Sequence, residues 1–217
     1  MNIPYIPEQL LEINEDINPV FLDRGIIIVD NWYKHFDLFQ QVVKTLPAAR
    51  WKWSDQGRNF KDYYDCRSKL SCNFLNVDNI KSFETIKNLI KYYFRIDEQL
   101  VLKNNPFDFN IYKNIKKDIP NKLQHHPHID HYFNCIVYFD DVSSGGTAIY
   151  KDIDKLENNE HINLLYDVSK LNYKLIKAVP NRLAIFPGTV YHGGYIDDHN
   201  QYVDNWRINQ VLFFIPK

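Results

Sequence analysis

From about residue 106 onward, the sequence is a succession of short strand-like segments separated by turn-forming residues. β-Branched and aromatic residues fill the segments, whereas proline, glycine, asparagine and aspartate fill the separators. The segments span residues 107–112, 128–139, 146–150, 181–186 and 206–215. Because these strand-like segments follow one another, this half of the chain is predicted to form an antiparallel sandwich or barrel.

The first 105 residues have a different pattern. Apolar residues at helical spacing predict helices over 35–46, where a proline ends the segment, and over 83–94. A β-branched run at 25–29 predicts a short buried strand. The aromatic segment 50–66 has no clear period and is expected to be a loop.

Helices first and strands second indicate an α+β protein. We expect one domain over residues 1–217, in which 1–105 form helical support and substrate loops and 106–217 form the β core. Residues 151–179 are polar, with scattered leucine and tyrosine, and are predicted to be an insertion between two strands.

The charge balance argues against some classes of partner. Lysine and arginine total 26, aspartate and glutamate total 27, and the net charge of −1 gives no bulk attraction to nucleic acid or an anionic membrane. Cys66, Cys72 and Cys135 are odd in number and lack Cys-x-x-Cys spacing, so we expect neither a disulfide framework nor a thiolate zinc site. Without a long apolar stretch or a signal peptide, the chain is predicted to be cytoplasmic.

The residues best suited to chemistry are histidines and an aspartate in the second half. His128 and Asp130 are two apart on a predicted strand, so their side chains are expected on one face. An imidazole beside a carboxylate supplies two of the three ligands of a 2-His-1-carboxylate metal triad. His192 fits the third position, because it follows a Pro-Gly turn and precedes two glycines that permit close approach.

Arg207 is a cation in the last predicted strand. Strand alternation places it on the same face as Asn209, Val211 and Phe213, which is a largely apolar surrounding. A buried cation is costly unless it meets an anion, and a guanidinium is shaped to hold a carboxylate through two hydrogen bonds. The sequence therefore predicts that Arg207 meets an anion, such as a carboxylate, in the interior.

The order His128-x-Asp130, His192, Arg207 resembles that of the iron(II)- and 2-oxoglutarate-dependent oxygenases, in their prolyl-hydroxylase-like branch. Residues 127–130 are similar to that branch's Pro-His-x-Asp motif. Residues 134–142 are similar to its next strand, and Gly145-Gly146-Thr147 is similar to the glycine-rich turn that follows that strand. The match covers about residues 106–216. It implies a double-stranded β-helix core, a jelly-roll or cupin-like fold, buttressed by the N-terminal helices.

The resemblance also implies roles for individual residues. His128, Asp130 and His192 would hold Fe(II), 2-oxoglutarate would take two further positions on the metal, and dioxygen the last. The implied co-substrate contacts are Arg207, Tyr112, Asn134 and Asn209. Halogenating relatives have a small residue in place of Asp130, so hydroxylation of an amino acid, a peptide side chain or another small molecule is expected.

Several assignments stay open at this point. Tyr112 and Asn134 fit co-substrate binding and plain packing about equally well. Arg58 belongs to an aromatic and basic stretch that either lines the mouth of a substrate pocket or packs beneath a long loop. His126 and His131 are candidate substrate contacts, although neighbours of a metal ligand are commonly exposed.

Two other functions remain open from the sequence. One is a cupin-type metal enzyme that needs no 2-oxoglutarate, and the other is a β-barrel that acts as a binding module without catalysis. The substrate is not encoded in a recognisable motif. The oligomeric state is open as well, with residues 151–179 as a candidate contact between subunits.

Overall fold

The computed structural model of the 217-residue chain describes residues 8–45, 51–53, 58–59, 63–70, 80–114, 119–130, 132–140, 145–151, 153, 165–203 and 205–217. For residues 51–53, 58–59, 63–70, 112–114 and 165 it describes the backbone alone.

The helices lie in the first half of the chain, as expected. They are α1 (Phe36–Thr45) and α2 (Lys81–Phe94), and 3₁₀ turns occur at Glu8–Leu11 and His199–Tyr202. Apolar residues three or four apart form the buried side of α1, namely Phe36, Phe39 and Val43. No helix among the described residues is long and apolar enough to cross a membrane.

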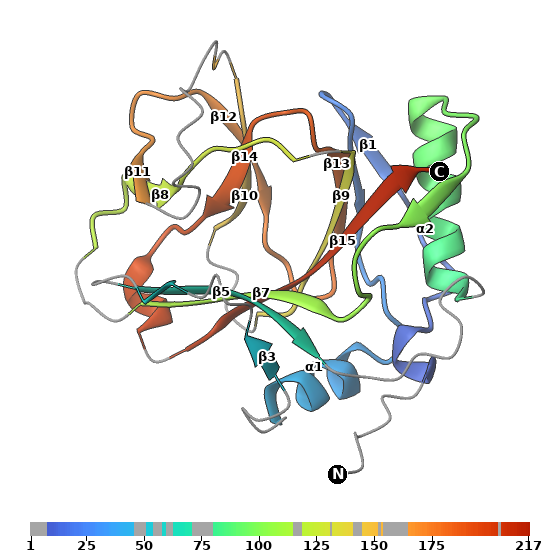
Figure 1. Cartoon of the computed structure of the whole chain (residues 1–217), viewed down its shortest axis with the longest axis horizontal. Coiled ribbons are helices and arrows are strands. Elements are labelled where there is room, and N and C mark those ends of the chain that lie inside the picture. The colour runs from blue at the N-terminus through green and yellow to red at the C-terminus, as the bar shows by residue number, and fades with distance from the viewer. Residues whose placement is uncertain are drawn as a thin grey trace.

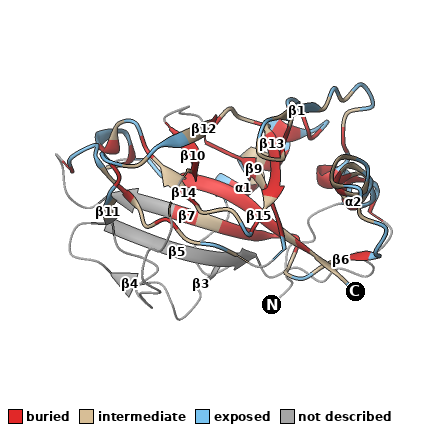
Figure 2. Cartoon of the chain, turned by 90° about the horizontal axis from the view of Figure 1, so that it is seen from above, coloured by how far each residue is buried: buried red, intermediate tan, exposed pale blue. Residues whose placement is uncertain are grey.

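One large antiparallel sheet contains most of the strands (Figure 1). Its order is β1 (Val20–Leu22), β2 (Ile26–Val29), β13 (Leu183–Pro187), β9 (Phe133–Tyr138), β15 (Arg207–Pro216), β7 (Asp108–Asn114), β5 (Tyr63–Leu70) and β3 (Trp51–Trp53), with β4 (Arg58–Asn59) on β5 and β6 (Leu100–Leu102) on β15. β9, β13 and β15, at its centre, are mostly buried, and Figure 2 shows much of this region in red.

Two small antiparallel sheets contain the remaining strands of the described residues. One is β12 (Tyr173–Lys177), β10 (Gly146–Tyr150) and β14 (His192–Tyr195), and the other is β11 (Leu165–Asp167) with β8 (Leu123–His125). The three-stranded sheet lies to one side of β9, β13 and β15, and α2 lies to the other side (Figure 1).

Strand alternation divides the core into two parts. Alternate residues of the central strands, such as Cys135, Ile185 and Leu212, pack with the helices in the larger cluster. The intervening residues, such as Tyr138 and Phe186, face the three-stranded sheet and pack with residues of β10 and β12. Both faces of the central strands are covered, and this is why their sequences are nearly continuous apolar runs.

The structure agrees with several predicted elements and differs in others. The strand predicted at 146–150 is β10, and both predicted helices are present with slightly different ends. The segment 50–66, expected to be a loop, contains β3, β4 and the start of β5. β3 and β4 pair with β5, and the pairing of β5 with β7 outweighs its weak alternation. The polar segment 151–179 contains β11 and β12, so it contributes strands to both small sheets.

The prediction of one strand over residues 128–139 is wrong. The strand β9 begins at Phe133, and His128 instead forms an isolated bridge with His192. Tyr132 has a φ of 78°, which turns the chain between His128 and the start of β9. His128 and Asp130 therefore do not come together by simple alternation along a strand.

Candidate metal centre

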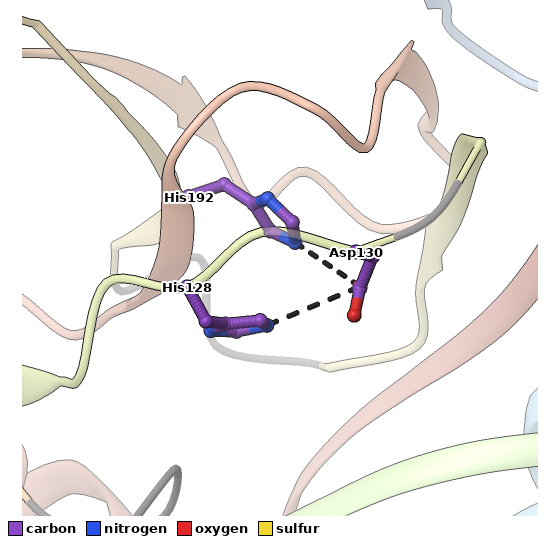
Figure 3. A group of neighbouring side chains, drawn as sticks. All are labelled: His128, Asp130 and His192. Carbon is purple, nitrogen blue, oxygen red and sulfur yellow. Dashed lines mark ion pairs between the residues drawn. The ribbon is translucent and has the colours of Figure 1, made fainter. Parts of the chain in front are cut away.

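The three side chains predicted as metal ligands converge in the structure. The ligand atoms of His128, Asp130 and His192 all lie within 4.8 Å of one another (Figure 3). Nε2 of His192 is 3.3 Å from Oδ2 of Asp130, and Nε2 of His128 is 4.0 Å from the same oxygen. Two atoms bonded to one metal ion at about 2.0–2.2 Å lie at most about 4.4 Å apart, and both distances to Asp130 fall within this limit.

Backbone pairing brings the two segments together. His128 and His192 form an antiparallel bridge, in which each backbone N–H donates to the other's carbonyl oxygen at 2.9 Å. The N–H of Asp130 then donates to the carbonyl of Gly188 at 2.8 Å. A β-carbon at position 188 would lie 2.7 Å from the carbonyl oxygen of Tyr132, so only glycine permits this approach. The turn before His192 thus also anchors Asp130.

Hydrogen bonds set the tautomer of both histidines. Nδ1 of His128 lies 3.0 Å from the carbonyl oxygen of His126, and Nδ1 of His192 lies 2.9 Å from that of Val190. Because a carbonyl oxygen only accepts, each Nδ1 carries a proton and each Nε2 directs a lone pair into the cluster. Burial, and then repulsion from His192, lowers the pKa of His128 to about 4, which leaves this imidazole neutral at pH 7.

Asp130 supplies the negative charge of the cluster. Burial acts to raise the pKa of its carboxyl, but the two neighbouring histidines and the hydrogen bond from Asn134 outweigh burial and lower the pKa. Asn134 on β9 adds a further donor, because its Nδ2 lies 3.1 Å from Oδ2 of Asp130. Two imidazoles and one ionised carboxylate are the donor set of a non-heme iron(II) centre with open positions.

Arg207 opens β15 and is buried, with 5% of its surface exposed. Its Nη2 donates to the carbonyl of Gly146 at 2.7 Å, whereas its Nε has no hydrogen-bond partner among the described residues. A buried guanidinium with an unused donor is costly unless an anion completes its bonding. The observed surroundings therefore fit a ligand carboxylate at this arginine.

Arg207 lies close to the strand that carries His192. A β-carbon on Gly194 would be 3.1 Å from Nη1 of Arg207, and Gly194 follows His192 by two residues on β14. Two residues of strand span about 6.6 Å, which is comparable with the length of a five-carbon dicarboxylate. His125 of β8 lies at the same place, because its Cδ2 would be 3.0 Å from the same β-carbon.

Asp140 is a buried acid near Arg207 that sequence reasoning missed. Its Oδ1 accepts a hydrogen bond from the backbone N–H of Ile208, and its Oδ2 accepts one from the hydroxyl of Tyr202 at 3.3 Å. Burial raises the pKa of Asp140 to about 6, and the charge of Arg207 is the largest influence that opposes this rise. Asp140 follows the end of β9, so strand alternation carries no signal of where its side chain lies.

Asn209, a predicted co-substrate contact, lies beside Arg207. It is buried, and in the amide orientation that satisfies both of its ends, its oxygen accepts from Nη1 of Arg207 at 3.2 Å. Tyr112 is the register partner of Arg207 where β7 pairs with β15, and its backbone alone is described. The roles of both residues stay predictions.

The three residues predicted to contact substrate are placed less fully. His126 is half-buried, and its ring centroid lies 5.2 Å from that of Tyr166 in an edge-on arrangement. Arg58 belongs to β4, where only the backbone is described, and His131 lies outside the described residues. Their contacts with a substrate stay predictions.

No protein-family model matches the sequence, and neither does any curated protein. Solved structures do match by fold. SnoN, the non-heme alpha ketoglutarate dependent epimerase from nogalamycin biosynthesis, superposes with a TM-score of 0.51 at 11% identity, over 89% of this chain and 77% of that chain.

Two further structures match over similar lengths. HygX from Streptomyces hygroscopicus, with nickel, 2-oxoglutarate and hygromycin B bound, has a TM-score of 0.49 at 10% identity, over 89% of this chain and 84% of that chain. A Pseudomonas putida prolyl-4-hydroxylase has a TM-score of 0.46 at 11% identity, over 90% of this chain and 94% of that chain. From the overlap with SnoN, this chain has the same fold as that protein.

Proposed function

We propose that the chain is an iron(II)- and 2-oxoglutarate-dependent oxygenase built on a double-stranded β-helix. The observation that carries the proposal is the convergence of the ligand atoms of His128, Asp130 and His192 within 4.8 Å, beside the buried Arg207. The shared fold with SnoN, an alpha ketoglutarate dependent protein, supports the same conclusion.

The residues of the cluster fit iron(II) better than a closed structural metal site. Three protein ligands on one side of an octahedral ion leave positions open for co-substrate and dioxygen, whereas a structural zinc site is filled by four protein ligands. The Nδ1 hydrogen bonds of His128 and His192 hold both rings in the required tautomer, so neither ring has to change tautomer when a metal binds.

Arg207 would bind the carboxylate of 2-oxoglutarate that is remote from the metal. Its Nε has no hydrogen-bond partner among the described residues, its Nη1 lies beside Gly194, two residues from His192 on β14, and Asn209 accepts a hydrogen bond from the same Nη1. A fixed cation at that distance would orient the co-substrate without contact with the metal. Tyr112 and Asn134 are further candidates for co-substrate contact.

When bound, iron(II) together with 2-oxoglutarate would supply the activation of dioxygen that oxidises a C–H bond of the substrate. The residues of the chain hold the ligands, orient the co-substrate and bury the site from water. Because the third ligand is the carboxylate of Asp130, hydroxylation of an amino acid, a peptide side chain or another small molecule is the proposed outcome. Arg58, His126 and His131 are the proposed substrate contacts.

Anaerobic titration with iron(II) and then 2-oxoglutarate tests this function. The wild-type chain should develop a weak visible charge-transfer band, and His192→Ala should lose it. His35→Ala is the matched control, because His35 is a half-exposed histidine that is paired with Glu12 and does not belong to the cluster. Release of succinate in the presence of candidate amino acids would then identify the substrate class.

Two results would overturn the proposal. One is the absence of a band in the wild-type chain, and the other is an unchanged band in His192→Ala.

A further inference from the structure

Asn134 lies between two of the three candidate metal ligands. It is 2% exposed, and its Nδ2 is 3.1 Å from Oδ2 of Asp130 and 2.9 Å from Nε2 of His192. An amide nitrogen carries two hydrogens, so a single side chain serves both acceptors. The opposite amide orientation would place Oδ1 against two acceptors, which excludes it.

The bond to His192 uses the lone pair that a metal would need. Nδ1 of His192 donates to the carbonyl of Val190, so Nε2 is unprotonated and accepts the hydrogen from Asn134. A nitrogen lone pair is available either to a hydrogen-bond donor or to a metal ion. The amide of Asn134 and a metal therefore compete directly for the same atom.

The oxygen of the Asn134 amide makes no hydrogen bond that would fix the side chain. This atom, Oδ1, is buried and has no hydrogen-bond partner among the described residues. Asn181 shows what a structural amide in this protein does, because its Oδ1 accepts from the N–H of Tyr33 at 2.7 Å and its Nδ2 donates to the carbonyl of Tyr33 at 2.9 Å. Among the described residues, the side-chain amide of Asn134 forms hydrogen bonds only with the two ligands.

We propose that Asn134 is a positioning residue for the metal-free cluster, and that metal binding displaces its amide from His192. The amide holds His192 and Asp130 together before the metal arrives, and its hydrogen bond to Nε2 is lost when the metal binds. Asn134 thereby stabilises the metal-free chain and weakens metal affinity. The inference rests on the metal site of the proposed function and on none of its later steps.

Titration with cobalt(II), followed by its visible absorption, measures the effect in Asn134→Ala and Asn134→Val. Both variants should bind cobalt(II) about tenfold more tightly, equivalent to ~1.4 kcal/mol, since the metal no longer displaces a hydrogen bond. The melting temperature should fall in the metal-free variants and fall less in the cobalt-loaded ones. The valine variant fills more of the space of the amide and keeps water from replacing it.

The matched control is Asn181→Gly, which removes a buried amide far from the cluster. Glycine suits this position because Asn181 has a φ of 61°. This variant should lower the melting temperature equally with and without cobalt(II), and its affinity for cobalt(II) should be unchanged. A merely structural role for Asn134 would produce the same pattern as this control.

A measurement on the wild-type chain avoids any dependence on the folding of variants. In the metal-free protein, nuclear magnetic resonance should detect a coupling across the hydrogen bond between Nδ2 of Asn134 and Nε2 of His192. Diamagnetic zinc(II) should abolish this coupling as it binds.

The outcomes separate the inference from the function. Unchanged or weaker cobalt(II) affinity in both variants, or a coupling that survives zinc(II), would overturn the role of Asn134 while leaving the metal centre intact. Failure of the wild-type chain to bind cobalt(II) at all would overturn the proposed function and this inference together.

Discussion

Gly194 and Arg207 meet so closely that a side chain at residue 194 would have to displace a neighbouring side chain. A β-carbon there would lie 3.1 Å from Nη1 of Arg207 and 3.0 Å from Cδ2 of His125, both closer than ordinary van der Waals contact. The glycine therefore lets the guanidinium approach the strand that carries His192. His192 of the metal cluster and Gly194, which contacts Arg207, are two residues apart on β14, so this strand connects the metal site with the guanidinium.

Gly194→Ala should weaken the binding of 2-oxoglutarate and leave the metal site intact. The added methyl group would push the guanidinium or the His125 ring away by a few tenths of an ångström, and oriented binding is sensitive to shifts of this size. We expect the apparent affinity for 2-oxoglutarate to fall about tenfold, ~1.4 kcal/mol, in an anaerobic titration of the iron(II) form. Wild-type affinity in this variant would show that the co-substrate does not contact this part of β14.

Arg207→Lys tests the shape of the cation rather than its charge. Lysine has no planar fork, so it would lose the two-bond grip on a carboxylate and the contact with Asn209. The KM for 2-oxoglutarate should rise about 10- to 100-fold, ~1.5–3 kcal/mol, with cobalt(II) affinity unchanged. Metal-dependent turnover that needs neither Arg207 nor 2-oxoglutarate would instead support the cupin-type alternative.

Asp140→Asn should change the pH dependence of stability. Burial raises the pKa of Asp140 from 3.8 to about 6, so its contribution to stability is full below about pH 4 and is lost as pH rises through about pH 6. Asparagine can keep the hydrogen bonds to Ile208 and Tyr202 without a charge. The free energy of unfolding of the variant, minus that of the wild type, should therefore increase by ~3 kcal/mol between pH 4 and pH 7.

Urea unfolding of both proteins at several pH values measures this difference. A difference that stays constant with pH would mean that Asp140 is not desolvated in the folded chain.

Phe39→Ala should strongly destabilise the helix-side core. The ring of Phe39 is fully buried and meets the rings of Tyr33, Phe107 and Phe139 at edge-on angles. The variant should lose ~3–5 kcal/mol of unfolding free energy, since transfer and cavity costs add. Leu38→Ala, at the adjacent and half-exposed position, should cost far less in the same urea series.

Local patterns were sufficient for much of the fold. The apolar spacing of residues 36–45 predicts α1, because one buried stripe is all that a surface helix needs. The run 146–150 likewise predicts β10 from local sequence alone, because it follows a glycine turn and contains residues that favour strands. Alternation along β15 correctly places Arg207 and Asn209 in the interior.

Local patterns failed where pairing over long distances decides the structure. The segment 63–70 has little alternation of its own and becomes β5 through its pairing with β7. Residues 128–139 look like one strand, yet the bridge between His128 and His192 separates the first ligand from β9. Such pairings depend on residues about 40 or more positions away, which a local window cannot contain.

The amino-acid sequence by itself determined the kinds of group available to the site: two imidazoles, one carboxylate and one buried guanidinium, in a fixed order along the chain. Only the tertiary structure decided which atoms meet. The bridge at His192 sets the ligand spacing, the bare backbone at Gly194 admits Arg207, and Asn134 lies where it donates to two ligands at once. Side-chain chemistry is a property of each residue, whereas distances between atoms follow from packing of the whole chain.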